Sequence, residues 1–176
     1  TRDGALWGMG QNSDGQLGRN GEPFNRLTQR IVPSGVVKVS AHGGDWGDQT
    51  AFIKTDGSLW TMGENDYGQL GDGNTTSRNA PFRVVESGVV DVAVGRWHTV
   101  FVKSDGSLWG MGRNHQKQLG TSLATTAIAT TPFEIVHSGV SRVFAGPAGT
   151  AFIKTDGSLW HMGKMVQNPN PPIPPA

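Results

Sequence analysis

The chain has 176 residues, of which 26 are glycine, and it carries a net charge of +1 and no cysteine. The absence of cysteine excludes a disulfide framework and a thiolate metal site. The near-neutral charge, without a basic run, argues against a sequence-independent nucleic-acid surface. No apolar run reaches the roughly 20 residues that span a bilayer, and the first residues show no signal-peptide pattern.

From the first residue onward, one motif recurs four times at intervals of about fifty residues. Each copy reads Asp-Gly, then Ser or Ala, then Leu-Trp-x-Met-Gly. A repeat of this length indicates a solenoid, a propeller or an array of small domains. The tryptophans of the four copies are 53, 49 and 51 residues apart, at Trp7, Trp60, Trp109 and Trp160.

Each copy predicts a β-hairpin, because Asp-Gly between two alternating runs is typical of a type I′ turn with positive φ at both central residues. In the third copy, this register pairs Val102 with Trp109 and Val100 with Met111. It places these four side chains on one face and Phe101 on the other. Apolar residues on both faces predict strands packed between neighbouring sheets. The recurring tryptophans and methionines are therefore predicted to be core between the sheets rather than a ligand cage.

Three further segments recur in each unit. The first is a polar loop, Asn-x-x-Gly-Gln-Leu-Gly, in which Lys117 replaces the glycine of the third copy, so that turn is predicted to differ or to be strained. The second is a short strand, led by proline in two units, and the third is a Ser-Gly-Val turn with a valine-rich alternating run. Each unit thus holds four short strands and no helical periodicity. Such units predict the blades of a β-propeller.

The fold class is therefore all-β, with propeller blades of four antiparallel strands. About three and a half blades are visible, because the first unit begins at its third strand and the last ends at its third. We place the units at about 1–35, 36–88, 89–139 and 140–165. Residues 166–176 are proline-rich and are predicted to form an extended tail or linker.

The motif Asp-Gly-Ser-Leu-Trp-x-Met-Gly-x-Asn-x-x-Gly-Gln-Leu-Gly, together with Gly-Arg-Trp-His-Thr at 95–99, resembles the regulator of chromosome condensation repeat, especially its bacterial members. The resemblance covers nearly the whole chain except the tail. It implies a β-propeller, usually of seven blades, so the visible chain corresponds to roughly half a ring. Missing blades or a second chain would complete that ring.

The family's known functions, as the resemblance implies them, cover several classes. They include guanine-nucleotide exchange on a small GTPase with chromatin binding, and inhibition of β-lactamases by a bacterial member. Many other members are secreted or surface proteins without an assigned role. The resemblance therefore favours an extracellular or cell-surface location, and the fold by itself does not fix the function.

The loops after the first and third strands of each blade are predicted to emerge on one side, which we call the loop side. The Asp-Gly and Ser-Gly-Val turns emerge on the opposite, turn side. Both length changes between units fall on the loop side, with a four-residue insertion near Trp46 and two extra residues within 121–131. Variation confined to one set of loops predicts a recognition face.

Exposed aromatic and arginine side chains are the anchors expected at a protein interface. The alternative is that Trp97 packs under its own loop and that Trp46 fills an insertion. The candidate partner-binding residues are Asp45, Trp46, Asp48, Tyr67, Arg96, Trp97 and His115.

The sequence predicts no catalytic residue, metal site or cofactor. The five histidines lack metal-ligand spacing, and no phosphate-binding glycine loop is present. Residues 66–74 are rich in oxygen ligands but lack the alternation of a calcium loop. His98 occupies a position of the repeated motif and is predicted to form a hydrogen bond with a neighbouring turn. A catalytic role is not expected for it, because no nucleophile or second base accompanies it in the motif.

We therefore interpret the chain as a non-enzymatic protein-binding or structural module whose partner contacts the loop side. One alternative is a carbohydrate-binding or surface-adhesion module, with the same aromatic rings stacking on sugars. Another is a subunit of an extracellular assembly, in which open blade edges pair between chains. Neither nucleic acid nor a membrane-spanning segment is expected.

Overall fold

The structure is a computed structural model that describes residues 3–18, 24–43, 47–121 and 127–164. The regular elements within these ranges are all β-strands, which form four antiparallel sheets that we call blades 1 to 4. Blade 1 contains β1 (Leu6–Gln11) and β2 (Phe24–Val32). Blade 2 contains β3 (Val36–His42), β4 (Gln49–Lys54), β5 (Leu59–Gly63) and β6 (Arg78–Val85). Blade 3 contains β7 (Val89–Val94), β8 (His98–Lys103), β9 (Leu108–Arg113) and β10 (Ile128–Val136). Blade 4 contains β11 (Val140–Ala145), β12 (Gly149–Lys154) and β13 (Leu159–Gly163).

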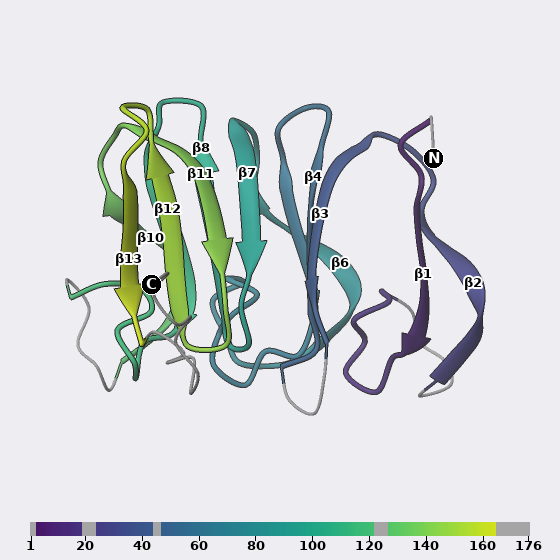
Figure 1. Cartoon of the computed structure of the whole chain (residues 1–176). Coiled ribbons are helices and arrows are strands. Elements are labelled where there is room, and N and C mark those ends of the chain that lie inside the picture. The colour runs from purple at the N-terminus through teal and green to yellow at the C-terminus, as the bar shows by residue number, and fades with distance from the viewer. Residues whose placement is uncertain (1–2, 19–23, 44–46, 122–126, 165–176) are drawn as a thin grey trace, which may run out of the picture.

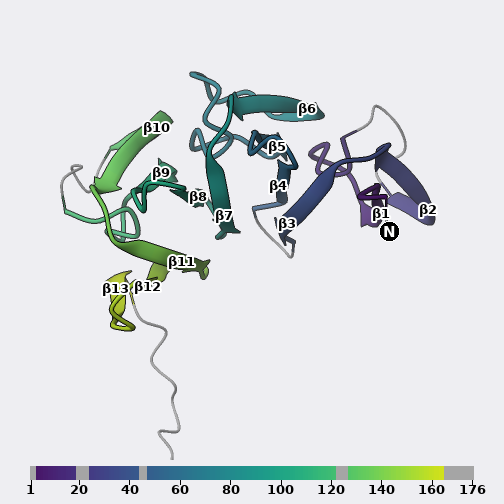
Figure 2. The same ribbon diagram turned by 90° about the horizontal axis from the view of Figure 1, so that it is seen from above.

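The blades stand side by side, with the loop side at the bottom of Figure 1 and the turn side at the top. Seen from above, they fan out along an arc, with β3, β7 and β11 on its inner side (Figure 2). Within blades 2 and 3, each strand pairs with the next one along the chain. The predicted propeller blades of four antiparallel strands are thus confirmed. The predicted tail, residues 166–176, lies outside the described residues.

The Asp-Gly hairpins form, but the predicted register was wrong by one residue. Phe101 lies opposite Trp109 in the β8–β9 pair. The amide of Gly106 donates to the carbonyl of Lys103 at 2.9 Å, and Gly106 is the one turn residue with a positive φ, 79°. The turn is therefore a three-residue loop with a glycine bulge, rather than a type I′ turn, which needs two positive φ angles.

The corrected register changes which side chains share a face. Phe101 and Met111 lie on the face of blade 3 that packs against blade 2, in a cluster with Ile53. Val100 and Leu108 lie on the other face, in the cluster shared with blade 4. The predicted packing of both hairpin faces between neighbouring sheets is confirmed, although the membership of each face was wrong.

The recurring tryptophans are less buried than predicted. Met111 is fully buried, whereas Trp109 is only partly buried and stacks on Phe101, with ring centroids 6.4 Å apart and planes at 13°. Trp7 and Trp160, in the outer blades, are about half exposed, at 48% and 50%. The prediction of a core between sheets therefore holds for the methionines of blades 2 and 3 more than for the tryptophans.

A chain of hydrogen bonds explains why aspartate, serine and tryptophan recur at fixed positions of the repeated motif. The hydroxyl of Ser107 donates to Oδ1 of Asp105 at 2.6 Å and accepts from Nε1 of Trp109 at 2.8 Å. Nζ of Lys103 lies 4.0 Å from the Trp109 ring centroid. The bonds from the Ser107 side chain and amide lower the pKa of the Asp105 carboxyl. Blades 2 and 4 repeat the same hydrogen bonds.

The polar loops tie each blade to the next. Oδ1 of Asn114 accepts a hydrogen bond from the amide of Leu119 at 2.9 Å, which fixes the turn from within. The Thr150 hydroxyl of blade 4 then donates to the carbonyl of Gln118 in the blade 3 loop at 2.8 Å. The same bond between neighbouring blades joins Thr50 to Gln16 and Thr99 to Gln69.

Asp91 joins the inner strands of three blades. Its carboxylate pairs with Lys38 on β3, and Oδ2 accepts a hydrogen bond from the amide of Val143 on β11 at 2.9 Å. The Asp91 side chain is nearly buried, so removing it would leave the Val143 amide unsatisfied. This contact holds the inner side of the arc together.

Lys117 adopts the same turn as its glycine counterparts, at a conformational cost. Its φ is 60°, and φ is 83° for Gly15 and 74° for Gly68 in the equivalent loops. A residue with a Cβ is strained in this left-handed region by about 1–2 kcal/mol. The expected strain is thus present, but the turn is unchanged.

Lys117→Gly is expected to raise the free energy of unfolding by about 0.5–1 kcal/mol, because relief of the strain exceeds the added entropy of the unfolded chain. Urea unfolding measures the change. Lys117→Ala is the matched control, since it removes the side chain and keeps the strain. Equal stability of the glycine and alanine variants would contradict the prediction.

Candidate binding surface on the loop side

Aromatic rings and guanidinium groups gather on the loop side of blades 2 and 3. Tyr67 lies in the loop after β5, and Arg96 and Trp97 form the tight connection between β7 and β8. Arg113 is the last residue of β9, and His115 follows it in the next loop. We call these five residues the loop-side stack.

Trp97 lies at the centre of the loop-side stack. The guanidinium carbons of Arg96 and Arg113 lie 4.1 and 4.4 Å from the centroid of its ring system. The Tyr67 ring lies 5.4 Å from it, with an interplanar angle of 53°, and Arg113 is also 4.9 Å from the Tyr67 ring. His115 meets the edge of Tyr67 at 6.4 Å. These are cation–π and tilted aromatic contacts, so the members of the stack hold one another in place.

The blade 3 backbone fixes the position of the stack. The amide of Arg113 donates to the carbonyl of Trp97 at 2.8 Å, which joins the end of β9 to the β7–β8 connection. In the blade 2 loop, the amide of Tyr67 donates to Oε1 of the buried Gln69 at 2.8 Å. Both aromatic residues are therefore attached to rigid parts of the repeat.

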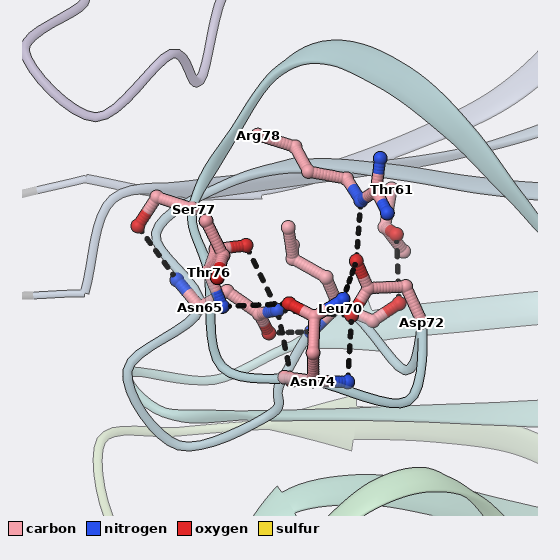
Figure 3. A network of polar contacts seen from close by, with 8 residues as sticks. All are labelled: Thr61, Asn65, Leu70, Asp72, Asn74, Thr76, Ser77 and Arg78. Carbon is pink, nitrogen blue, oxygen red and sulfur yellow. Dashed lines mark hydrogen bonds and ion pairs between the residues drawn. The ribbon is translucent and has the colours of Figure 1, made fainter.

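The loop that carries Tyr67 is built around a network of polar contacts (Figure 3). Asn65 donates to Oδ1 of Asp72 at 3.0 Å and accepts from the amide of Leu70 at 2.9 Å. Nε of Arg78 pairs with the Asp72 carboxylate, and the Thr61 hydroxyl donates to the carbonyl of Leu70 at 2.8 Å. The loop therefore presents Tyr67 from a structure that its own hydrogen bonds hold in place.

The carboxylate of Asp72, in the oxygen-rich part of this loop, already accepts hydrogen bonds from other residues of the chain. Burial raises the pKa of Asp72, but hydrogen bonds from Arg78, Asn74 and Asn65 outweigh burial and hold that pKa below its usual value. In the described ranges, no group of three or more histidine, aspartate or glutamate residues is arranged to hold a metal ion. The described residues also contain no helix that could cross a membrane.

The charge of the loop side changes from blade to blade at one repeated position. The amide of Glu64 in blade 2 donates to the carbonyl of Asp48, just as the amide of Arg113 donates to that of Trp97. Oε2 of Glu64 accepts from the amide of Gly47 at 2.8 Å and from that of Asp48 at 3.2 Å. Burial raises the pKa of Glu64, even though these amides act to lower it. Blade 2 thus presents a carboxylate where blade 3 presents a guanidinium.

The two guanidinium groups of the stack make aromatic contacts but no side-chain polar contact within the described residues. In the part of the chain that the structure describes, neither Arg96 nor Arg113 has a side-chain hydrogen bond or an ion pair, and the Nε atom of each is buried without a partner. Arg78 and Arg83, by contrast, pair with Asp72 and with Glu86. Stacking uses the faces of a guanidinium group and does not provide an acceptor for its N–H donors.

The structure brings together four of the seven predicted site residues. These are Tyr67, Arg96, Trp97 and His115, all of which belong to the loop-side stack. Trp97 is half-buried. It is therefore neither fully exposed, as a binding anchor was predicted to be, nor fully packed under its own loop, as the alternative predicted.

Asp48 does not present its side chain to solvent. It is only 4% exposed, and its carboxylate accepts a hydrogen bond from Nε2 of Gln16 in blade 1 at 3.0 Å. It therefore joins two blades instead of offering a binding group. Asp45 and Trp46 lie outside the described residues.

Arg113 was not among the site residues predicted from the sequence. The residue occupies the variable position between Met-Gly and Asn in the repeated motif, which also holds Gln11 and Glu64. That variability within a nearly invariant motif is the signal that could have identified it. The position was overlooked because it belongs to the end of a strand and not to a loop.

His98 is buried in the repeat and is remote from solvent. Its Nε2 lies 3.0 Å from the Thr150 hydroxyl, so the predicted hydrogen bond exists, but its partner is on strand β12 of blade 4 rather than on a turn. The Thr150 hydroxyl donates its own proton to Gln118, so Nε2 of His98 carries the donated hydrogen. Burial, with a smaller effect of His42, lowers the pKa of His98 from 6.5 to about 3.

A hollow of about 690 Å³ lies away from the loop-side stack. It is bounded by β1, β2 and β3 and lined by apolar side chains such as Trp7, Val37 and Val39, together with Thr28 and Lys38. In the described part of the chain, β1 pairs with β2 alone. Of its two polar side chains, Lys38 already pairs with Asp91, so we interpret the hollow as a gap in the packing between blades 1 and 2.

Two sequence-family models match the chain. Both describe the regulator of chromosome condensation repeat, and they cover residues 56–102 and 89–118. The matched residues run from the Asp-Gly turn of blade 2 to the polar loop of blade 3. They include all five residues of the loop-side stack.

Known proteins resemble the chain in sequence and in fold. The human probable E3 ubiquitin-protein ligase HERC4 is 35% identical over 105 residues, which is 56% of this chain and 10% of that protein. The crystal structure of human WBSCR16 superposes with a TM-score of 0.78 and 26% identity, over 95% of this chain and 45% of that one. Prp20p from Saccharomyces cerevisiae gives a TM-score of 0.71 at 20% identity, over 92% of this chain and 39% of that one, and this likeness shows the fold alone.

The chain spans about a tenth of the length of HERC4 and less than half of the two structural relatives. All three relatives are eukaryotic, so they lend no support to the predicted bacterial origin or surface location.

Proposed function

Because the chain belongs to the regulator of chromosome condensation repeat family, we propose that it is a non-enzymatic propeller module that binds a protein partner through its loop side. The observation that carries the proposal is the loop-side stack. It combines Trp97 and Tyr67 with two arginines whose N–H groups have no partner among the described residues.

The composition and rigidity of the stack support this function. Tryptophan, tyrosine and arginine are the residues that most often dominate the binding energy of protein interfaces. Their side chains are already held by mutual stacking and by the backbone bond between Arg113 and Trp97. Binding would therefore lose little additional side-chain entropy.

The turn side is a weaker candidate. Its aspartates, Asp56, Asp105 and Asp156, each bind the serine two residues ahead, and the geometry is the same in three blades. These groups are used by the fold itself. A surface that repeats unchanged offers little basis for distinguishing one partner from another.

Protein binding is also known for one of the structural relatives. Prp20p binds Gsp1p and histones. Because its identity to this chain is only 20%, that relative supports a protein-binding use of the scaffold and does not name the partner of this chain.

The test is selection from a display library of random peptides on the wild-type chain. We expect Trp97→Ala to lower the affinity for the selected peptides by at least about 30-fold, because truncating an interface tryptophan removes about 2 kcal/mol or more of binding free energy. Biolayer interferometry measures the affinities, and circular dichroism checks that the variant is folded.

His137→Ala is the matched control, since this ring lies on the turn side with 91% of its side chain exposed. It should bind the selected clones as the wild type does. The proposal fails if no clone is enriched, or if Trp97→Ala retains wild-type affinity.

A further inference from the structure

We infer that the loop-side stack recognises carboxylate groups on an acidic segment of its protein partner. The inference rests on the proposed function and adds the chemistry of the partner. Its starting point is that Arg96 and Arg113 stack on aromatic rings but have no side-chain hydrogen bond or ion pair among the described residues.

A stacked guanidinium group keeps its planar edge available. Arg113 contacts both Trp97 and Tyr67, so its orientation is defined on two sides. The N–H donors of such a group form a fork that matches the two oxygens of a carboxylate. Two such groups beside one tryptophan are complementary to two carboxylates held near an apolar group.

Other arginines show what this chain does when the carboxylate is its own. Arg78 pairs with Asp72 within the Tyr67 loop, and Arg83 pairs with Glu86. Arg78 and Arg83 also lie over aromatic rings. The two groups of arginines therefore share the stacking contact and differ in the carboxylate. In the described residues, Arg96 and Arg113 lack the acceptor that the other two have.

The carboxylate at the equivalent position of the neighbouring blade is not available to fill this role. Oε2 of Glu64 is held by the amides of Gly47 and Asp48. No ion pair joins Glu64 or Asp66 to an arginine within the described ranges. Within the described part of the chain, neither Arg96 nor Arg113 has a carboxylate partner.

A protein segment fits this surface better than a nucleic acid does. The loop side of blade 2 carries Glu64, and repulsion from Asp66 and Asp14 contributes to the raised pKa of Glu64. These carboxylates would repel a continuous chain of phosphates. A short acidic segment can place its charges on the arginines alone, while its apolar side chains contact Trp97 and Tyr67.

The test uses two synthetic peptides, acetyl-Glu-Glu-Leu-Glu-Glu-amide and its counterpart with glutamine in place of every glutamate. Nitrogen-15 NMR follows the Nε–H signals of Arg96 and Arg113 as each peptide is added. We expect the glutamate peptide to shift both signals and to bind at least about 10-fold more tightly than the glutamine peptide at low salt. The difference should shrink as salt is added, because the contact is between charges.

Arg96→Lys and Arg113→Lys separate the shape of the guanidinium group from its charge. Each variant keeps a positive charge but loses the planar fork, so each should bind the glutamate peptide at least about 10-fold more weakly than the wild type does. Arg142→Lys, at an exposed position on β11, is the matched control and should have no effect.

Several results would overturn the inference. They are equal binding of the two peptides, unchanged binding by the lysine variants, or a preference of the same arginines for inorganic phosphate or a DNA duplex over the glutamate peptide. The inference and the proposed function fail separately. Library clones that depend on Trp97 but lack aspartate and glutamate would overturn the inference and leave the proposed function standing, whereas an absence of clones would remove both.

Discussion

Phe101→Ala is expected to lower the free energy of unfolding by about 3–5 kcal/mol. Phe101 is fully buried between blades 2 and 3, in a cluster with Ile53 and Met111, and its ring stacks on Trp109. The substitution removes apolar burial and leaves a cavity that two sheets on either side cannot close. The effect should be large because the Phe101 ring lies fully buried at the contact between two blades.

Urea unfolding followed by tryptophan fluorescence measures this change. Phe144→Ala is the matched control, because Phe144 is 48% exposed on β11, and it should change the stability by no more than about 0.5–1 kcal/mol. Phe101→Leu should cost less than Phe101→Ala, because it restores most of the volume. Similar losses for the two alanine variants would show that the assigned packing between blades 2 and 3 is wrong.

Acidification is expected to destabilise the fold through His98. Burial lowers the pKa of this group to about 3 in the folded chain, whereas the unfolded chain binds the proton near 6.5. The unfolded state therefore binds more protons between these values. The stability that depends on neutral His98 is fully present above pH 6.5 and is lost as the pH falls toward 3. Between about pH 7 and pH 5, the loss from this group is about 2 kcal/mol.

His98→Gln isolates this contribution. Glutamine can still donate to Thr150 but does not titrate, so the variant should be less stable at neutral pH and less sensitive to pH. The measurement is the free energy of unfolding of both proteins at several values between about pH 7 and pH 5. Parallel pH profiles for the wild type and the variant would contradict the assignment of a buried neutral His98.

The repeat was sufficient to predict the blades, because four strands with apolar residues on both faces must pack between similar sheets. It was not sufficient to predict the hairpin register. Asp-Gly is compatible both with a two-residue type I′ turn and with a three-residue loop closed by a glycine bulge. The bond from Ser107 to Asp105 accompanies the bulged form. A difference of one residue exchanged Phe101 and Val102 between the two faces.

The sequence was sufficient to predict that the candidate site lies on the loop side, but not to predict all of its residues. The strand order alone placed Tyr67, Trp97 and their neighbours on the loop side, and the structure brings them into contact. The burial of Asp48 could not be predicted, because it depends on Gln16 from the preceding blade. Arg113 contacts the other residues of the stack from the end of strand β9, so the variation between loops does not identify it.

The most direct test of binding through the loop side is a footprint of a selected peptide by hydrogen–deuterium exchange. Such binding predicts protection in residues 64–77, 95–97 and 113–121, with no change at the Asp-Gly turns of residues 55–58 and 104–107. Protection centred on those turns, or on the edge strand β1, would contradict the assignment of recognition to the loop-side stack.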